Sequence, residues 1–201
     1  ALWLGLFSQG ICYYHPSMDN FPLYNRTNTY GKWNNEDVCA FAEDEQGNIL
    51  LGTLDGLHLY APSTQRVTVP YKELDHQICW VLYKDSKQRI WVGTYQENLY
   101  CIDKGKVRLY SYPSGGYQQD PDFRNIRAII EDKKGRMWIS VYGGVGSLDV
   151  NTGKITLLVE KHPELKEYKT ADALALDNSG KLIVGAYNGL YIYDQETDQV
   201  W

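Results

Sequence analysis

An internal repeat that recurs along the whole chain is the feature that most constrains its fold. Each copy has a short apolar strand, an Asp-containing turn, an anchor residue that begins a second strand, and a hairpin into a third strand. Four copies read VCAFAEDEQGNILLGTLDGLHLYAP, CWVLYKDSKQRIWVGTYQENLYCID, IRAIIEDKKGRMWISVYGGVGSLDV and ADALALDNSGKLIVGAYNGLYIYDQ. A fifth copy that lacks its first strand, LWLGLFSQGICYYHP, opens the chain.

The spacing of the copies is regular. The anchors are separated by 47, 41, 47 and 45 residues and are Trp3, Leu50, Trp91, Trp138 and Ile183. A turn aspartate stands six residues before each of the last four anchors, at Asp44, Asp85, Asp132 and Asp177. Such regularity indicates that one supersecondary unit is repeated along the chain.

Each unit divides into four short strands. In the third copy we expect strands at Cys79–Tyr83, Ile90–Gly93, Asn98–Ile102 and Val107–Tyr112. The turns between them contain Gly, Asn or Asp, which tolerate positive φ. The first two strands of a unit are apolar on both faces, as expected for a sheet that lies between two others. A period of this length with four strands predicts an all-β fold of β-propeller blades.

The repeats predict one propeller segment over residues 1–201, with about five blades. The blades cover approximately residues 1–24 (partial), 38–71, 78–112, 125–160 and 170–201. Because the first blade lacks its inner strand and the last ends in an outer strand, the two cannot complete each other. We therefore expect an open arc, or part of a seven-bladed ring, with negligible helix. Since the sequence opens inside a strand-like run, we also expect it to be a piece of a longer protein.

Composition excludes several classes of function. The net charge of −5 and the pI near 5.4 argue against a nucleic-acid surface, which needs clustered Lys and Arg. No apolar run approaches the roughly 20 residues of a membrane span, so we expect no membrane contact by this segment.

No metal or cofactor is predicted. The four cysteines (Cys12, Cys39, Cys79 and Cys101) lack the spacing of a zinc site. Their apolar neighbours favour buried free thiols, with a disulfide as the alternative. The EDEQGN stretch around Asp44 faintly resembles a calcium loop, but the same position is a hairpin turn in every repeat.

The pattern I-x-x-I-x-E-D-x-x-G-x-x-W-I-G-T…G-L-Y-x-Y-D resembles the two-component regulator propeller repeats. Leu50, Ile183 and Ser140 depart from the Trp and Gly of that pattern. The resemblance implies a periplasmic sensor ectodomain of a Bacteroides-type hybrid two-component system. It further implies that the segment is not catalytic, that the kinase modules lie outside it, and that it detects oligosaccharides and controls polysaccharide-utilisation genes.

Two alternatives stay open. The stretch RMWIS…GKITLL is similar to the blades of streptogramin lyases, whose chemistry depends on His, Glu and a metal. The histidines of this chain (His15, His58, His76 and His162) do not recur at equivalent repeat positions, which argues against that enzyme. A protein-interaction scaffold is the other alternative, because propellers serve many functions.

A candidate ligand site follows from one structural position in the repeats. The residues five before each turn aspartate should lie at the entrance of the central channel, and they are Cys39, Trp80, Arg127 and Asp172. A packing requirement would repeat, whereas these four differ in chemistry. The turns after the second strands lie at the same end and carry Phe7, Leu54, Tyr95, Tyr142 and Tyr187. Three long linking segments, 25–37, 112–125 and 161–170, join this face and add Trp33.

Aromatic rings with charged groups between them suit a sugar, because C–H faces stack on rings and hydroxyls bind charged groups. The predicted ligand-binding residues are Trp80, Arg127, Asp172, Trp33, Tyr95, Tyr142 and Tyr187. The alternatives are that the tyrosines and Trp80 fill space in the fold and that Arg127 and Asp172 form a structural ion pair. The predicted partners are an oligosaccharide and, through the exposed blade faces, a second copy or further blades of the same ectodomain.

Overall fold

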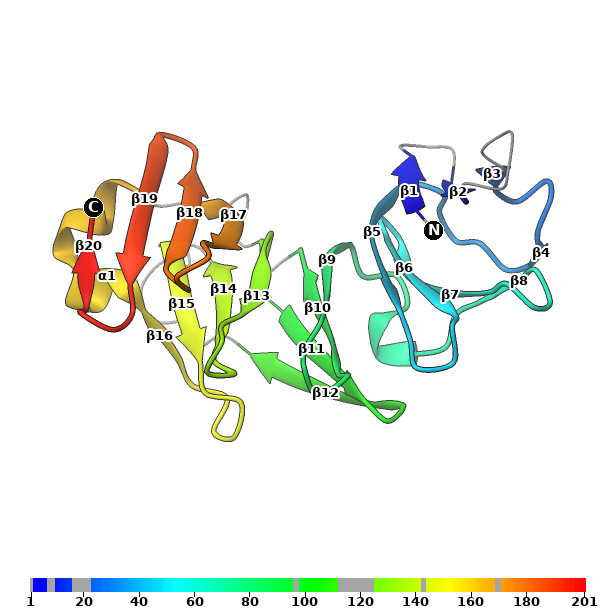
Figure 1. Ribbon diagram of the computed structural model, residues 1–201. Helices are drawn as coiled ribbons and strands as arrows, with labels where there is room; N and C mark the ends of the chain where they lie inside the picture. The colour runs from blue at the N-terminus through cyan, green and yellow to red at the C-terminus, as the bar shows by residue number, and fades with distance from the viewer. Residues whose placement is uncertain are drawn as a thin grey trace.

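The structure is a series of antiparallel β-sheets along the chain (Figure 1). This computed structural model describes residues 2–6, 10–15, 23–95, 98–111, 125–141, 144–168 and 171–201. We number the five sheets in chain order as blades 1 to 5. The all-β propeller-blade fold expected from the repeats is confirmed.

Blade 1 contains β1 (Leu2–Leu6), β2 (Gly10–Tyr14) and β3 (Leu23–Tyr24). Blade 2 contains β4 (Tyr30–Gly31), β5 (Val38–Glu43), β6 (Ile49–Thr53), β7 (Gly56–Ala61) and β8 (Arg66–Thr68). Blade 3 contains β9 (Cys79–Lys84), β10 (Ile90–Thr94), β11 (Asn98–Asp103) and β12 (Lys106–Ser111). Blade 4 contains β13 (Ile129–Glu131), β14 (Met137–Val141), β15 (Gly144–Leu148) and β16 (Ile155–Leu157). Blade 5 contains β17 (Ala171–Leu176), β18 (Leu182–Ala186), β19 (Gly189–Asp194) and β20 (Gln199–Val200).

Helical structure is confined to short connecting segments in the described part of the chain. The link between blades 2 and 3 contains the 3-10 turn η1 (Lys72–Leu74). The link between blades 4 and 5 contains α1 (Leu158–Lys161) and η3 (Pro163–Glu167). The buried Leu158 and Leu165 fix this second link to the core between the two blades.

The blades stand side by side in an open arc, with β5, β9, β13 and β17 on the inner side (Figure 1). The inner strands contact one another in sequence, β5 against β9, β9 against β13 and β13 against β17. Blade 1 begins at β1, which carries the anchor Trp3 and pairs with β2, as expected for a copy without its inner strand. The number of blades in a complete ring stays a prediction.

Blade 2 has a strand that the repeat pattern does not predict. The short strand β4, from the link between blades 1 and 2, adds to the outer edge of the blade by pairing with β8 in parallel. Gly31 makes this pairing feasible, because it has φ +107° and a Cβ atom there would lie 1.9 Å from the Val67 carbonyl oxygen.

The hydrophobic core lies between consecutive blades rather than inside any one of them. One cluster of buried residues fills each of the four gaps, and the anchors Leu50, Trp91 and Trp138 project into the gap that follows their own blade. Glycines two residues after an anchor let the next inner strand approach closely. A Cβ atom on Gly52 would lie 2.7 Å from the Cys79 carbonyl oxygen, and one on Gly93 would lie 2.6 Å from Ile126.

The turn aspartates organise the first hairpin of each blade. In blade 3, the Asp85 carboxylate accepts hydrogen bonds from the backbone N–H groups of Lys87 and Arg89, both at 2.9 Å. Its other oxygen accepts the indole N–H of the anchor Trp91 at 2.8 Å and the Arg89 Nε–H at 2.6 Å. Asp132 and Trp138 form the same pair at 3.0 Å in blade 4. The aspartate and the tryptophan six residues later are therefore spaced so that the carboxylate accepts the indole N–H.

Two sheet faces at the ends of the arc are uncovered. Leu190 of blade 5 is 61 % exposed, whereas its equivalents Leu57, Leu99 and Val145 are buried by the following blade. On blade 1, Leu2 and Leu4 are 50 % and 39 % exposed, whereas their equivalents in blades 2 to 5 are buried. Both faces thus have the composition of a blade interface without the covering sheet.

The anchor tryptophans should dominate stability. We expect Trp138→Ala to lower the free energy of unfolding by about 3–5 kcal/mol, because it removes a large buried ring and the partner of the buried Asp132. Urea denaturation followed by circular dichroism measures this change. Leu109→Ala, at a half-exposed position on β12, is the control and should change stability by less than about 1 kcal/mol. Equal effects of both substitutions would contradict the anchor role.

The turn aspartate of blade 3 predicts a loss of stability in acid. Burial acts to raise the pKa of Asp85, but the hydrogen bonds from Trp91 and Arg89 outweigh it and hold the pKa below its ordinary value. The stabilisation is therefore complete above a pH of about 4 and is lost as pH falls through the lower, folded-state pKa.

Unfolding free energies measured across this pH range test the assignment. Asp85→Asn should destabilise the protein by about 1–3 kcal/mol at neutral pH and flatten the acid dependence. Asp103→Asn, at an exposed position of the same blade, should leave the pH dependence unchanged. An unchanged acid dependence in Asp85→Asn would contradict this role for the carboxylate.

Candidate functional site

The candidate site lies at the start of the inner strands, where most of them contain a β-bulge. In blade 3, Cys79 pairs with Thr94 and Val81 pairs with Gly93, so Trp80 has no partner in the ladder. The same shift leaves Cys39 unpaired in blade 2 and Asp172 unpaired in blade 5. A bulge turns its extra residue away from the regular alternation of the sheet. This explains why residues at this position differ while their neighbours in the core remain apolar.

In blade 4, a side chain rather than a bulge holds the beginning of the inner strand at the equivalent position. Ser140 stands where other blades have glycine, and its Oγ accepts hydrogen bonds from the backbone N–H groups of Arg127 and Ala128, at 3.0 and 2.8 Å. Ser140 thus holds the beginning of the inner strand and leaves the Arg127 side chain exposed. We name the four positions Cys39, Trp80, Arg127 and Asp172 the bulge positions.

All four bulge positions are exposed in the described structure. Trp80 is 37 % exposed, so its ring is not a fully buried core element. The Arg127 Nη1 atom lies 2.7 Å from Asp172 Oδ1, and both side chains are about half exposed. The structure therefore brings Arg127 and Asp172 into an ion pair across two blades, with its polar atoms still open to solvent.

Two of the predicted aromatic residues lie beside bulge positions. Tyr95 follows Thr94, the ladder partner of Cys79, and is partly buried. Tyr187 follows Ala186, the ladder partner of Ala171, and is 90 % exposed. Trp80 and Tyr95 thus share one end of blade 3, and Asp172 and Tyr187 share the same end of blade 5. Tyr142 lies outside the described residues, as do Phe7 and residues 112–124 and 169–170.

Among the described residues, two buried oxygen atoms without a hydrogen-bond partner lie next to the bulge positions. They are Asp37 Oδ1 and Asn125 Oδ1, each two residues before a bulge position, in blades 2 and 4 respectively. Asn125 also forms an isolated bridge with Tyr95. A buried polar group is costly without a partner, so a water or a ligand group would stabilise these oxygens. The sequence analysis did not single out either residue. Both stand two residues before a bulge position, and a polar residue at this repeat position is a signal that could have identified them.

Trp33 does not lie on this surface. It is only 8 % exposed and packs among Ile11, Leu51 and other core residues between blades 1 and 2. Its indole N–H donates to the Thr29 hydroxyl at 2.8 Å, and its ring stacks on the His58 ring. The expectation that Trp33 offers an open aromatic platform fails, because its linking segment folds back on blade 2 rather than over the channel end.

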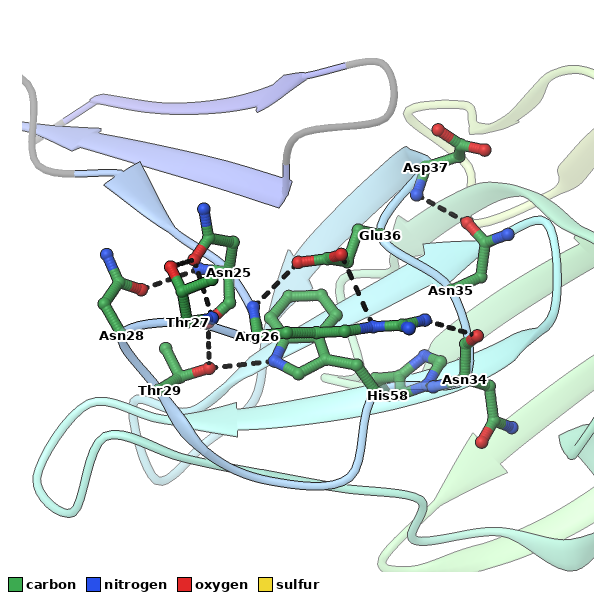
Figure 2. Close-up of polar contacts among 11 residues, drawn as sticks. Asn25, Arg26, Thr27, Asn28, Thr29, Asn34, Asn35, Glu36, Asp37 and His58 are labelled. Atoms are coloured by element: carbon green, nitrogen blue, oxygen red, sulfur yellow. Dashed lines mark hydrogen bonds and ion pairs between the residues drawn. The ribbon is translucent and has the colours of Figure 1, made fainter.

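The segment that carries Trp33 is held by its own polar contacts (Figure 2). The Asn25 side chain accepts hydrogen bonds from Thr27, and Arg26 contacts both the Asn34 carbonyl and the Glu36 carboxylate. His58 Nε2 accepts the backbone N–H of Asn34 at 2.9 Å. These contacts fix the segment to blade 2 and give it a structural role.

The histidines do not form a catalytic set in the described structure. Burial lowers the pKa of His58 to about 4, so its ring is neutral at ordinary pH and serves as the acceptor for Asn34. His76 contacts Asp55 at 2.7 Å in the link between blades 2 and 3. His162 contacts Asp198 and Glu164, each at 3.2 Å, beside blade 5. His58 and His76 thus lie near the same two aspartates, Asp55 and Asp75, whereas His162 lies beside blade 5.

The cysteines are free, and Cys12, Cys79 and Cys101 are buried as expected. Cys39 is the exception, because it occupies an exposed bulge position. Among the described residues, no group of His, Cys, Asp and Glu is arranged to hold a metal ion. The Asp44 carboxylate accepts the backbone N–H groups of Gln46 and Asn48, both at 2.8 Å, which is the hairpin turn expected from the repeats.

The arc of blades, with exposed bulge positions of mixed chemistry, places this chain in the class of β-propeller proteins. Its sequence matches the two component regulator propeller family over residues 73–96 and 121–143. The resemblance found from the repeats is confirmed in these two segments, which cover parts of blades 3 and 4. No curated protein matches the chain in sequence.

Solved structures give the same fold. The extracellular domain of BT3049 from B. thetaiotaomicron, described as a hybrid two component system, superposes with a TM-score of 0.73 at 17 % identity. That match covers 97 % of this chain and 26 % of the other, so this chain spans about a quarter of its relative.

Enzymes share the fold as well. An ancestral GH74 enzyme matches with a TM-score of 0.74 at 13 % identity, over 99 % of this chain and 29 % of that one. A streptogramin B lyase matches with a TM-score of 0.55 at 16 % identity, over 82 % of this chain and 53 % of that one. At these identities the likeness establishes the fold only. No helix in the described residues has the length and apolar character needed to cross a membrane.

Proposed function

We propose that this chain is a ligand-sensing propeller segment of the extracytoplasmic region of a hybrid two-component system. Its ligand would be an oligosaccharide, and its output would control genes for polysaccharide use. The observation that carries the proposal is the ring of bulge positions, where Trp80 offers an exposed ring and Arg127 and Asp172 offer exposed polar atoms. The family match and the sensor ectodomain with the same fold support the choice of class. The same comparison supports a periplasmic location.

The chemistry of the bulge positions suits an uncharged sugar. Arg127 and Asp172 neutralise each other, so they present donors and acceptors without a net local charge. A pyranose ring can stack on an exposed aromatic face while its hydroxyls bind charged partners. The unpaired Asn125 oxygen nearby marks a place where water or a ligand hydroxyl would complete a hydrogen bond.

The alternatives differ in what they require. A streptogramin-type lyase needs His, Glu and a metal at one place, whereas His162 lies beside another blade than His58 and His76, and no group of His, Cys, Asp and Glu among the described residues is arranged to hold a metal ion. We therefore propose a non-catalytic segment, with the kinase modules elsewhere in the protein. A protein-binding scaffold is the second candidate, and Tyr187 on blade 5, which is 90 % exposed, favours it over an enzyme.

We also propose that another blade covers the exposed faces at the ends of the arc. In the whole protein the covering blade would belong to the same ectodomain, and in this 201-residue chain alone it would belong to a second copy. Leu190→Lys should shift the isolated chain from oligomer to monomer in light scattering, because it places a charge on the exposed apolar face. Lys106→Glu, on the outer strand of blade 3, is the control. A wild-type chain that stays monomeric at high concentration would contradict the proposal.

The ligand site is tested by calorimetry on the intact ectodomain with a set of neutral oligosaccharides. Trp80→Ala should remove a stacking surface and Arg127→Ala a charged donor, each weakening binding by about 1–3 kcal/mol. Stability should change little in Arg127→Ala, because its ion pair with Asp172 is exposed. Lys106→Ala serves as a matched control away from the site. Binding that is unaffected by both Trp80→Ala and Arg127→Ala would show that this face is not the site.

A further inference from the structure

A second surface with the features of a binding site lies on the outer edge of blade 2, at the opposite edge of that sheet from β5 and its bulge position Cys39. It is formed where β4 pairs in parallel with β8, and its groove has a volume of about 590 Å³. Tyr30 pairs with Arg66 and Gly31 with Val67. Hydrogen bonds from the Tyr30 N–H to the Gln65 carbonyl, at 2.9 Å, and from the Lys32 N–H to the Val67 carbonyl, at 3.0 Å, fix the pairing.

The two faces of this ribbon differ sharply. Val67 is fully buried against the core, while Arg66 and Thr68 on either side of it are exposed. Since side chains alternate along an extended chain, Tyr30 on β4 and Lys32 directly after it share the solvent side. Tyr30 is 68 % exposed. An open aromatic ring therefore lies beside two cations and a hydroxyl, and we name this surface the basic ribbon.

The charges of the basic ribbon are unbalanced. Its groove is lined by three cations, Lys32, Arg66 and Lys72, and by one acid. That acid, Asp75, already accepts a hydrogen bond from the Asn34 side chain at 2.7 Å and lies 3.7 Å from His76 Nε2. Within the part of the chain that the structure describes, the three cations have neither an ion pair nor a side-chain hydrogen bond.

Another groove of this molecule shows the opposite arrangement. The groove of about 230 Å³ beside blade 5 also contains lysines, but Lys134 pairs with Glu196 at 2.6 Å and Lys181 with Asp194 at 3.4 Å. Two of its three lysines are thus paired with carboxylates, and the third, Lys133, donates a hydrogen bond to the Asn178 carbonyl at 2.6 Å. Three cations without an ion pair, in a groove whose single acid has other partners, favour a negatively charged partner from outside on a chain with a net charge of −5.

We propose that the basic ribbon binds an acidic oligosaccharide, one whose sugar rings carry sulfate or carboxylate groups. The anionic groups would meet Lys32, Arg66 and Lys72, and a sugar ring would stack on Tyr30. The proposal is independent of the bulge positions, which differ from the ribbon in having a balanced charge. It gives the β4 strand, an addition to the repeat, a function in ligand binding.

Calorimetry on the whole protein tests this with a heparin-derived sulfated tetrasaccharide, a tetragalacturonate and a neutral tetrasaccharide, at low and high salt. Both acidic probes should bind, and should bind more weakly at high salt. Any binding of the neutral probe should be unchanged by substitutions in the basic ribbon. The triple variant Lys32→Gln, Arg66→Gln, Lys72→Gln should weaken acidic-probe binding at least about tenfold. Tyr30→Ala should weaken it a few-fold at either salt concentration.

A triple variant with the same change in net charge is the control. Lys104→Gln, Lys106→Gln and Lys154→Gln lie at exposed positions on other blades and should leave binding unchanged. An equal loss in both triple variants would reduce the effect to overall charge and overturn the proposal, as would equal binding of acidic and neutral probes or no binding of the acidic ones. If the triple variant is misfolded, acidic-probe binding is measured on the single variant Arg66→Gln instead, and unchanged binding there would overturn the proposal. Trp80→Ala should leave acidic-probe binding intact, which separates this test from that of the bulge positions.

Discussion

The burial of each sheet against the next is the constraint on which the rest of this structure depends. A sheet that is apolar on both faces has no stable form alone, and each gap between blades holds its own hydrophobic cluster. The anchors Leu50, Trp91 and Trp138 project into these gaps, and Gly52 and Gly93 admit the next inner strand. The aspartate at the turn holds the indole N–H, so the position of the ring depends on a hydrogen bond inside its own blade.

This dependence explains how much of the fold the sequence predicts. The period, the anchors, the turn aspartates and the strands of blade 3 follow from local patterns, and they lie in the structure where those patterns put them. The strand β4 could not be predicted in this way. Its pairing with β8 joins residues more than thirty positions apart and depends on Gly31 at φ +107°. The same long-range folding buries Trp33 against His58, which is why the length of the linking segment was a misleading guide to its location.

The candidate site was partly accessible to the same reasoning. Differences in chemistry at one repeat position indicated residues outside the core, and the β-bulges supply the physical reason. The bulges themselves have no signature in a single sequence, since they arise from an unequal number of residues in paired strands. The unpaired oxygens of Asp37 and Asn125 also emerge only from the packed structure, because satisfaction of a hydrogen bond is a property of neighbours in space.

The two surfaces differ in the kind of specificity that their charges allow. At the bulge positions, Arg127 and Asp172 are partners of each other, so the proposed ligand would compete with an existing ion pair and would gain from matching both polarities. On the basic ribbon, the cations lack partners within the described structure, and any anion of suitable size gains from approaching them. Attraction of the second kind is screened by salt, whereas stacking and paired hydrogen bonds are much less so. A molecule with both surfaces could therefore respond to the shape of a sugar at one place and to its charge at another.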